Sequence, residues 1–315
     1  MTQPSQGAAG PVAGRTYIII NPAAGQDEPE RLKRSLGAAF AARDASFDIA
    51  MTEYSGHASE LARRAAGEGY RAVAVVGGDG TLAEAATGLA GTNTPLAIIP
   101  RGTANQVAQN LRIPIELEHA VDVAVNGIVT PVDLGRIDDR AFALVAGAGF
   151  DAAVMATATR ELKERWGFGA YVYAAVKEAL SATPTRFHIR ADGKEFDVDA
   201  VSVMVANVGE LFPAFIPLRF ALGPRPTSSW HDGLLDVVIL APRTPPDFAM
   251  ILWRAARHRF PGDDRMIHFQ ATEITIDADP AIAVQIDGDP AGTTPVTAAA
   301  LPSALKVILP APEYP

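Results

Sequence analysis

The chain has 315 residues, more than one hydrophobic core usually serves, so two domains are expected. Hydrophobic residues make up 48% and charged residues 20%, a balance typical of a globular protein and not of a disordered one. The net charge of -9 excludes a broad basic surface, so no nucleic-acid partner is predicted. The absence of cysteine excludes disulfides, thiolate zinc sites and cysteine nucleophiles, and it is compatible with a cytoplasmic location.

Residues 1–14 are rich in Ala, Gly, Pro and Gln and lack the charged start and apolar run of a signal peptide, so a disordered tail is predicted. No stretch reaches the roughly 18 apolar residues that a membrane span needs. Any contact with a bilayer is therefore expected to be peripheral and transient. The histidines lack ligand-like spacing and the serines lack a nucleophile-elbow pattern, which disfavours a histidine metal site and a hydrolase.

Short apolar runs alternate with amphipathic stretches over residues 15–130, which predicts a parallel sheet covered by helices. The expected strands are Tyr17–Ile20, Phe47–Met51, Ala72–Val76 and Leu96–Ile99. The expected helices are Asp27–Arg43, Ala58–Gly67 and Ile115–Asn126. Ligands of open α/β sheets bind at the carboxyl ends of the strands, so the loops that follow these strands form the candidate site.

Residues 131–310 show the shorter alternation of antiparallel strands, interrupted by two helical stretches. The expected strands are Val129–Leu134, Ala141–Val145, Arg186–Ala191, Phe196–Val205, Leu234–Leu240, Glu273–Ile276, Ala283–Ile286 and Lys306–Leu309. The expected helices are Tyr171–Ala182 and Pro246–Phe260. The predicted fold is thus an α/β domain over 15–130 followed by a mostly β domain over 131–310, whose last segment could pack back on the first domain.

Three strands of the α/β domain are followed by glycine-containing loops, namely Asn21–Gly25, Gly77–Glu84 and Pro100–Asn105. Glycines let backbone N–H groups approach an anion closely, and a following helix presents its positive end to the same point. The three loops together predict a phosphate cradle. Asp79 stands between glycines and could hold Mg²⁺ on bound phosphates, although an aspartate in such a loop is often only a turn residue.

A structural explanation exists for part of this pattern. Thr81 with Glu84, and Thr103 with Gln106, both have the spacing of a capping box at the start of a helix. For either threonine alone, capping and ligand binding remain equal alternatives. No lysine follows the glycines, so the loop is not of the Walker type, and a metal with backbone dipoles must balance the phosphate charge.

These motifs, in this order, resemble the diacylglycerol kinase catalytic-domain family, specifically the bacterial soluble lipid kinases of the YegS and DgkB type. The resemblance covers about residues 15–310 and includes later segments that match in family order: Val132–Gly135, Gly147–Ala152, Asp232–Asp236 and Gln285–Pro290. It implies an α/β domain related to those of phosphofructokinase and NAD kinase, a β-sandwich second domain, and a nucleotide cleft between them. It also implies an enzyme that uses ATP and Mg²⁺ to phosphorylate a lipid hydroxyl.

By that resemblance, the residues that would contact ATP are Asn21, Pro22, Gly25, Thr52, Gly77, Gly78, Asp79, Gly80, Thr81, Glu84, Gly102, Thr103 and Asn105. Asp232 would hold a structural magnesium ion together with carbonyl oxygens of Ser229 and Leu234. Asp289, with Asp287 beside it, would take the proton from the lipid hydroxyl, and a positioned carboxylate suits that task. An isolated Asp-Gly-Asp-Pro segment would be no more than a hairpin turn, so this assignment depends on the other motifs.

The sequence departs from the family pattern at three positions. Gln106 stands where many relatives have Asp, Ala83 where many have Asn, and Arg101 where a small or apolar residue is common. Arg101 could reach a nucleotide phosphate or an anionic headgroup, or be a solvated loop residue. The other two departures keep open a catalytically weakened nucleotide- or lipid-binding regulator.

Three segments are candidates for lipid contact: Leu211–Pro217, Trp166–Gly169 with Tyr171, Tyr173, Lys163 and Arg165, and the basic stretch Arg254–Arg259. For Leu211–Pro217 the favoured explanation is core packing, and for Arg254–Arg259 it is a solvated helix face. The segment around Trp166 is a candidate because aromatic side chains suit the bilayer interface and basic ones attract anionic lipid. Diacylglycerol, phosphatidylglycerol and a sphingoid or ceramide lipid all remain open as acceptors, with an NAD kinase-like enzyme as the rival activity. Nothing in the sequence decides between a monomer and a homodimer.

Overall fold

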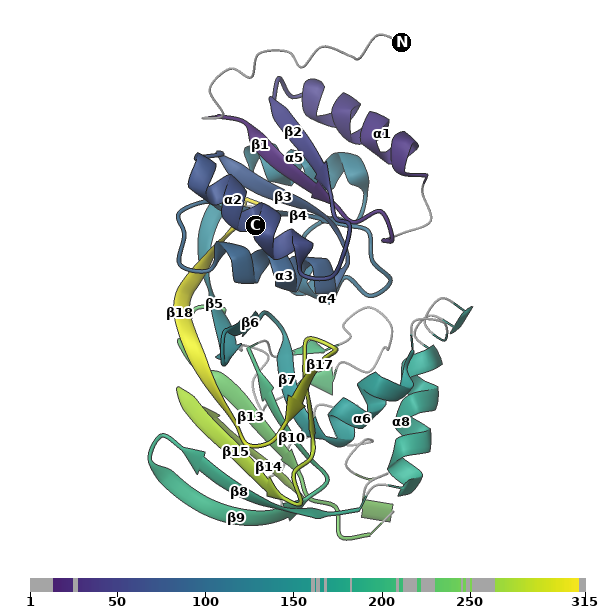
Figure 1. The fold of residues 1–315 in the computed structure, drawn as a ribbon, viewed down its shortest axis with the longest axis vertical. Coiled ribbons are helices and arrows are strands. Elements are labelled where there is room, and N and C mark those ends of the chain that lie inside the picture. Colours follow the sequence, from purple (N-terminus) through teal and green to yellow (C-terminus); the bar gives the residue numbers. More distant parts are fainter. Residues whose placement is uncertain are drawn as a thin grey trace.

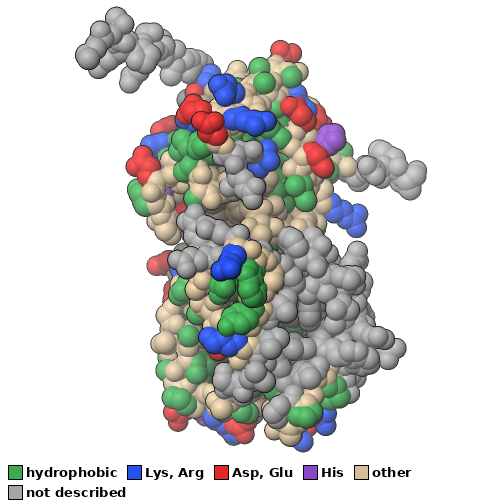
Figure 2. Space-filling model, turned by 90° about the vertical axis from the view of Figure 1, so that its right-hand side faces the viewer, with side chains coloured by type: hydrophobic (Ala, Val, Ile, Leu, Met, Phe, Trp, Pro, Cys, Tyr) green, Lys and Arg blue, Asp and Glu red, His purple; other side chains and the backbone are tan. Residues whose placement is uncertain are grey.

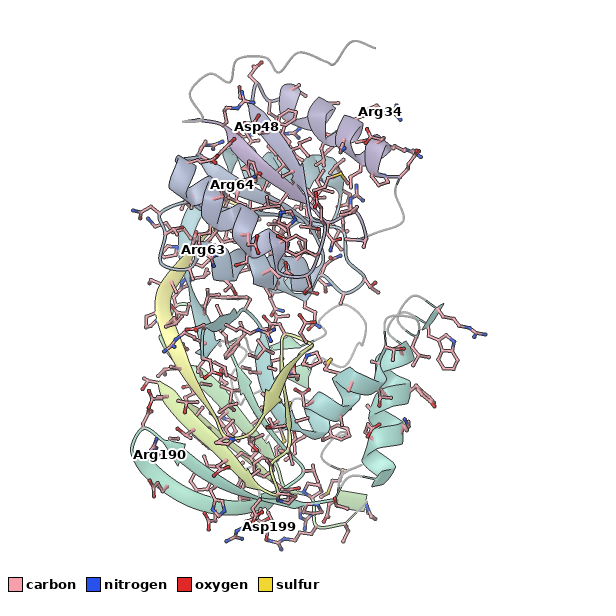
Figure 3. The ribbon with its side chains drawn as sticks, in the orientation of Figure 1. Arg34, Asp48, Arg63, Arg64, Arg190 and Asp199 are labelled. Atoms are coloured by element: carbon pink, nitrogen blue, oxygen red, sulfur yellow. The ribbon has the colours of Figure 1, made fainter. Side chains whose placement is uncertain are left out.

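The computed structural model describes residues 14–24, 28–159, 162, 165–166, 169–181, 183–207, 210–211, 220–221, 230–244, 246–247, 250 and 264–311. Two domains are stacked along the long axis of the molecule, with the amino-terminal α/β domain above the β-rich domain (Figure 1). Charged side chains such as Arg34, Arg64 and Arg190 lie along the outside of the two domains (Figure 3). Within the described residues, no helix is long and apolar enough to cross a membrane.

The first domain is a parallel sheet with helices on both faces, in the strand order β2-β1-β3-β4. The strands are β1 (Thr16–Ile20), β2 (Phe47–Met51), β3 (Ala72–Gly77) and β4 (Leu96–Pro100). The helices are α1 (Pro29–Ala41), α2 (His57–Glu68), α3 (Asp79–Leu89), α4 (Gln106–Asn110) and α5 (Leu117–Asn126). Successive residues of β1 point to opposite faces, so Ile18 and Ile20 pack with α1 and α5, whereas Ile19 packs with α2 and α3. Both faces of the strand are therefore buried, as its continuous apolar sequence predicts.

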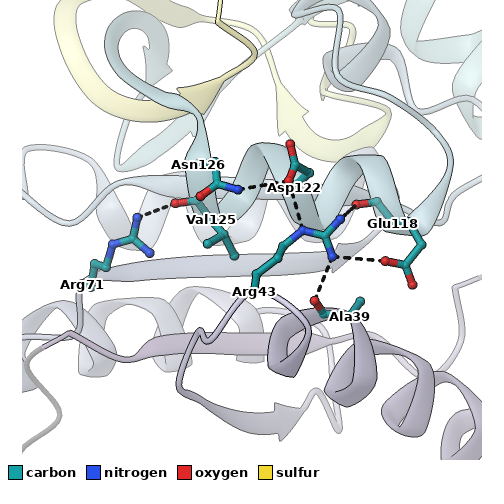
Figure 4. A network of polar contacts seen from close by, with 7 residues as sticks. All are labelled: Ala39, Arg43, Arg71, Glu118, Asp122, Val125 and Asn126. Carbon is teal, nitrogen blue, oxygen red and sulfur yellow. Dashed lines mark hydrogen bonds and ion pairs between the residues drawn. The ribbon is translucent and has the colours of Figure 1, made fainter.

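Arg43 fastens α1 to α5 on the outer face of this sheet (Figure 4). Its guanidinium donates to the Ala39 carbonyl at 2.8 Å and to the Glu118 carbonyl at 2.8 Å, and it forms ion pairs at 3.1 Å with the carboxylates of Glu118 and Asp122. Arg71 adds a bond of 2.7 Å to the Val125 carbonyl. Four hydrogen bonds from the Arg43 guanidinium thus connect the last turn of α1 with two turns of α5.

The second domain is a sandwich of mostly antiparallel strands with helices at one side. Its first elements are β5 (Ile128–Ile137), β6 (Arg140–Phe142), β7 (Val145–Gly149), α6 (Phe150–Thr157), α8 (Gly169–Ser181), β8 (Thr185–Ala191), β9 (Lys194–Ala200) and β10 (Ser202–Ala206). The remaining elements are β11 (Glu210–Leu211), β12 (Phe220–Ala221), β13 (Leu235–Leu240), β14 (Met266–Ala271), β15 (Glu273–Asp279), β16 (Ala283–Ile286), β17 (Asp289–Thr293) and β18 (Val296–Leu309). One sheet has the order β14-β13-β10-β7-β16-β17, and a buried apolar cluster fills the space between it and β8 and β15 of the other sheet. The predicted fold class is confirmed.

The last strand, β18, runs through both domains (Figure 1). Its first part pairs with β15 of the sandwich, and Val307 near its end pairs in parallel with Leu96 of β4. β5 lies antiparallel to β18 over most of its length, with a shift of register between Leu301 and Leu305. The ten-stranded sheet is therefore continuous from β2 in the first domain to β9 in the second.

Two strands expected from the sequence are each divided in the structure. The segment Ala141–Val145 ends as β6 at Phe142 and resumes as β7, because the intervening backbone N–H groups donate to the Asp287 carboxylate and not to a neighbouring strand. The segment Phe196–Val205 divides at Val201, where the chain passes from the ten-stranded sheet to the six-stranded one. Most of the predicted helix Pro246–Phe260 lies outside the described residues, as do residues 1–13 of the tail.

Candidate phosphoryl-transfer site

The first two glycine loops are joined through the Asn21 side chain. β1 and β3 are neighbours in the sheet, so the loops after them emerge side by side. Asn21 donates from its side-chain amide to the Thr81 hydroxyl at 2.8 Å, and its amide oxygen accepts the Ala23 N–H at 2.9 Å. Its backbone N–H donates to the Val76 carbonyl at 3.0 Å. The Asn21 side chain therefore fixes the position of one loop relative to the other.

The second and third loops touch backbone to backbone. A Cβ atom added to Gly102 would lie 2.5 Å from the Gly78 Cα, a separation that no side chain tolerates. Arg101 donates its backbone N–H to the Gly77 carbonyl at 2.8 Å. Asn105, with a left-handed φ of 48°, accepts the Gly102 N–H at 2.7 Å and donates back to the Gly102 carbonyl at 2.8 Å. All three loops thus converge at the carboxyl edge of the sheet.

Asp79 is the first residue of α3 and lies between the second and third loops. Its carboxylate accepts the Val107 N–H at 3.0 Å, at the start of α4. Burial raises the pKa of Asp79, and the backbone N–H groups of Val107 and Gln106 oppose that shift. A cation would stabilise the ionised form of this carboxylate, and Mg²⁺ prefers such oxygen ligands.

Neither of the two capping boxes considered from the sequence is formed. Helix α3 begins at Asp79 with Gly78 as its N-cap, so Thr81 lies inside the first turn and its hydroxyl accepts from Asn21. Helix α4 begins at Gln106 with Asn105 as its N-cap, and Thr103 stays exposed in the loop before it. The helix after the second loop therefore has its N-cap three residues before Thr81, whereas the helix after the third loop has its N-cap two residues after Thr103.

The acidic hairpin of the second domain faces this loop cluster. Asp287 and Gly288 form the two-residue turn between β16 and β17, with φ of 47° and 92°, and Asp-Gly is a preferred pair for a turn with two positive φ angles. The Asp287 carboxylate accepts the backbone N–H groups of Ala143, Leu144 and Val145 at 2.8 to 3.0 Å. Burial raises the pKa of Asp287 to about 6 against these three bonds, and the negative charge of Asp79 adds to the rise. The carboxylates of Asp79 and Asp287, which belong to different domains, therefore interact electrostatically.

Asp289 has different surroundings from Asp287. Its side chain is exposed, and within the described residues no hydrogen bond involves its carboxylate. Asp289 lines a cavity of about 440 Å³ between the domains, together with Asp287, Arg140, Glu84 and Ser55. Arg140 donates to the Pro290 carbonyl at 3.2 Å and thereby braces the hairpin from the side of β6.

Glu84 forms the opposite wall of this cavity. One carboxylate oxygen accepts the Ala58 N–H at 3.2 Å, so this side chain satisfies the amino-terminal end of α2 and not that of its own helix. Gly80, Ala83 and Thr87 lie on the same face of α3 and also line the cavity. An acidic hairpin and a glycine-rich helix start thus enclose one space, which can hold a phosphorylated ligand beside an acceptor group.

Comparison with known proteins assigns both domains of this chain to known families. The model of the diacylglycerol kinase catalytic domain matches residues 15–137, and the model of the YegS C-terminal NAD kinase beta sandwich-like domain matches residues 144–309. The chain is 33% identical to a diacylglycerol kinase of Mycobacterium tuberculosis over 80% of its own length and 81% of the relative's. The chain belongs to the diacylglycerol kinase family.

Other members of the diacylglycerol kinase family match over nearly the whole chain. A diacylglycerol kinase of Bacillus subtilis is 28% identical and covers 94% of this chain, which in turn covers 96% of that protein. A crystal structure of a putative diacylglycerol kinase from Bacillus anthracis superposes with a TM-score of 0.76 at 26% identity, over 94% of this chain and 97% of that one. The similarity to this family therefore includes both domains and their connection.

Of the remaining predicted site residues, Thr52 lies at the same edge of the sheet as the loops, and two others lie outside the described residues. Thr52 donates its backbone N–H to the Ile20 carbonyl at 2.9 Å, which places it at the end of β2 beside the first loop. Gly25 of that loop and Ser229 of the expected magnesium site lie outside the described residues.

Asp133, rather than Asp232, ties the segment of the expected magnesium site to the rest of the fold. The Asp133 carboxylate is buried and accepts the Gly233 N–H at 2.7 Å and the Ser303 N–H at 2.7 Å. Asp232 is exposed, and its carboxylate accepts the Leu234 N–H at 3.0 Å. Among the described residues, no cluster of three or more Asp, Glu, His or Cys side chains could hold a metal ion. Carbonyl oxygens would have to supply the remaining ligands of a magnesium ion at Asp232.

Sequence reasoning missed two polar residues of this region as site residues. Arg140 follows two aspartates in what reads as an exposed turn, and no local signal marks it as part of a cavity. Gln285 belongs to the matched segment Gln285–Pro290, but a glutamine in a strand has no chemistry of its own that would single it out. The match of the segment Gln285–Pro290 to the family was the one signal that could have indicated Gln285.

Proposed function

We propose that this protein is an ATP-dependent lipid kinase that transfers the γ-phosphate of ATP to a lipid hydroxyl, with Asp289 as the general base. Membership of the diacylglycerol kinase family supports the reaction class. The observation that carries the assignment of the base is the contrast between the two hairpin aspartates. Asp287 has its carboxylate occupied by three backbone N–H groups, whereas the Asp289 carboxylate is exposed at the cavity wall. The Asp289 carboxylate can therefore accept a proton from a bound alcohol without losing a bond to the backbone, which favours it over Asp287 as the base.

The phosphate groups of ATP are assigned to the cradle of the three loops. Backbone N–H groups near Gly78, Gly80 and Gly102 lie in the second and third loops, and the amino-terminal end of α3 adds its partial positive charge. Asp79 is the carboxylate that would hold Mg²⁺ beside these phosphates. The ion would supply charge neutralisation of the transferred phosphoryl group.

A second magnesium ion is assigned to Asp232 with the carbonyl oxygens of Ser229 and Leu234. The donors are all oxygen atoms, the type that Mg²⁺ prefers. The bond from Gly233 to Asp133 holds this segment next to the bulge of β18, so an ion there would act on the fold and not on the phosphate. Asp232→Asn should then abolish any increase of the melting temperature by MgCl₂ in the absence of nucleotide.

The proposal is tested by offering radiolabelled ATP and MgCl₂ with diacylglycerol, phosphatidylglycerol, sphingosine, ceramide and NAD in separate detergent-mixed assays. Phosphate on one or more of the lipids is expected, and mass spectrometry of the products identifies the acceptor. Phosphate on NAD alone would overturn the lipid kinase assignment in favour of the NAD kinase-like alternative. The full-length similarity to proteins named as diacylglycerol kinases favours the lipid.

A regulator that binds nucleotide or lipid without turnover is the second candidate, and Gln106 and Ala83 are the observations that favour it. Gln106 begins α4, directly beside the carboxylate of Asp79, where many relatives supply a further acid. The regulator would bind ATP but give no metal-dependent transfer to any lipid, and Asp289→Asn would then change nothing.

Access to the lipid is assigned to a surface on α8 and the segment before it. Trp166 and Tyr173 are 53% and 47% exposed, and their rings meet edge to face at 6.0 Å. Arg165 and Lys177 are exposed as well, and Figure 2 shows hydrophobic side chains flanked by basic ones on this side of the molecule. Aromatic rings suit the bilayer interface, and basic side chains attract anionic headgroups.

Flotation with vesicles tests this surface. Trp166→Ala should lower binding to phosphatidylglycerol vesicles, whereas Tyr54→Ala, at an aromatic side chain of equal exposure in the first domain, should leave it unchanged. If Trp166→Ala and Tyr54→Ala bound the vesicles equally well, the surface on α8 would not be the one that contacts the lipid. The candidate segments Leu211–Pro217 and Arg254–Arg259 lie, apart from Leu211, outside the described residues.

A further inference from the structure

A chain of two side chains leads from α6 to the turn of the acidic hairpin. Gln285 on β16 is 1% exposed, and its amide oxygen accepts the Gly288 N–H at 2.6 Å. Its amide nitrogen donates to the carboxylate of Asp151, in the first turn of α6. The orientation of the amide is thereby determined, because a carboxylate only accepts and an N–H only donates.

Strand β7 leaves the space that the Asp151 side chain occupies. A Cβ atom added to Gly147 would lie 2.0 Å from the Asp151 carboxylate oxygen, so only glycine leaves room for this side chain. Gly147 pairs with Gln285 across the strands β7 and β16. Glycine on one strand and glutamine on the next thus make room for a buried polar contact between the six-stranded sheet and α6.

The turn that precedes Asp289 is consequently held from two sides. The Asp287 carboxylate fastens it to the connection between β6 and β7, and the bond from Gly288 to Gln285 fastens it toward α6. The hairpin ladder itself uses the pair of Ile286 and Asp289 and not the Gly288 N–H. An apolar residue of the same size would fill position 285 equally well. Burial of an amide there costs desolvation free energy, and packing alone does not require it.

We propose that Asp151 and Gln285 are positioning residues, which orient the Asp287-Gly288 turn and thereby direct the Asp289 carboxylate into the interdomain cavity. Neither side chain is among those that line that cavity, so both are placed to act through the turn and not on a ligand held there. Their effect on turnover is therefore expected in kcat and not in the KM for ATP, whose loops belong to the other domain. This inference rests on the proposed role of Asp289.

Three variants separate positioning from packing. Gln285→Glu keeps the acceptor for Gly288 but sets a second carboxylate against Asp151. Asp151→Asn alone keeps an acceptor for the Gln285 amide. The double variant restores a donor and acceptor pair in reversed order, because the new amide at 151 donates to the new carboxylate at 285, whose second oxygen still accepts from Gly288.

The three variants are expected to have different kcat values, in a definite order. Gln285→Glu should lower kcat by about tenfold or more with an unchanged KM for ATP, the size that loss of a supporting hydrogen bond produces at other sites. Asp151→Asn should remain close to the parent protein, and the double variant should recover most of the loss. A folded Gln285→Glu protein with the parent kcat, or a double variant no better than Gln285→Glu, would overturn the proposal.

Gln285→Met covers the case in which Gln285→Glu does not fold, since it keeps the volume and removes both hydrogen bonds. Gln270→Met on β14, at an exposed position of the same sheet, is the matched control. Hydrogen exchange of the peptide that contains Gly288 should accelerate in Gln285→Met and not in the control, and kcat should fall only in the former. Unchanged exchange or unchanged kcat would contradict the inference.

Exchange is measured without substrate. If the parent protein phosphorylated no lipid, the proposed function would fail while the exchange data still tested the hydrogen-bond chain.

Discussion

At the scale of single residues, the two aspartates of the hairpin differ in what their carboxylates bind. Asp289→Asn removes the proposed base without changing the size of the side chain. We expect kcat to fall by about 10² to 10⁴, the usual contribution of general base catalysis, with little change in the KM for ATP. Asp199→Asn, at an exposed position on the far end of the second domain (Figure 3), should retain full activity. Equal activity of both variants would remove Asp289 from the mechanism.

Asp151 provides a prediction on pH and stability. Burial raises the pKa of Asp151 to about 6, against the bond from Gln285 that lowers it. The folded state therefore binds more protons than the unfolded state between about pH 4 and 6, and this residue's contribution to stability is lost as the pH rises through that window.

Asp151→Asn lacks this titration. Its free energy of unfolding relative to the parent protein should rise between about pH 4 and 7, by up to about 3 kcal/mol. Urea denaturation of both proteins at several pH values measures the difference. A difference that does not change with pH would show that Asp151 has an ordinary pKa in the folded protein.

At the scale of elements, the contact of two loops makes a glycine irreplaceable. Gly102→Ala would force the third loop away from Gly78, because the added Cβ would lie 2.5 Å from its Cα. We expect the KM for ATP to rise by about tenfold or more, since the N–H groups of both loops would leave their positions. Isothermal titration with a non-hydrolysable ATP analogue checks the same loss of affinity.

Gly67→Ala is the control for this substitution. Gly67 lies in α2, its added Cβ would meet no atom within 4 Å, and its φ is not left-handed. The variant should bind ATP normally and gain roughly 0.5–1 kcal/mol of stability, as is usual for alanine in a helix. A similar loss of ATP affinity in both variants would mean that the loop contact is not the cause.

Elements were predictable from the sequence where their signals are local. Runs such as Phe47–Met51 and Ala283–Ile286 have the bounds that their apolar patterns predict, and the glycine loops at the strand ends marked the site. The division of Ala141–Val145 was not predictable, because it depends on a carboxylate about 140 residues later in the chain. The different surroundings of Asp287 and Asp289 were not predictable for the same reason, since both occupy one short motif and only their hydrogen-bond partners distinguish them.

At the scale of the whole molecule, the ten-stranded sheet makes the two domains depend on one another. A fragment of residues 15–137, the part that matches the catalytic-domain family model, would lack β18 beside β4. The unpaired N–H and C=O groups of a buried apolar strand such as Leu96–Pro100 would then be open to other chains. We expect this fragment to aggregate, as light scattering during refolding would show, whereas the full chain refolds to a monodisperse species.

The position of β18 also has a consequence for synthesis. The strand follows all other described strands in the sequence, yet it lies between β4 and β15 near the middle of the ten-stranded sheet. The sheet cannot close while the ribosome is still producing the second domain, so β4 waits with an open edge for about two hundred residues. A cell that makes this protein must keep that edge from pairing with the wrong strand until β18 has been synthesised and can pair with β4.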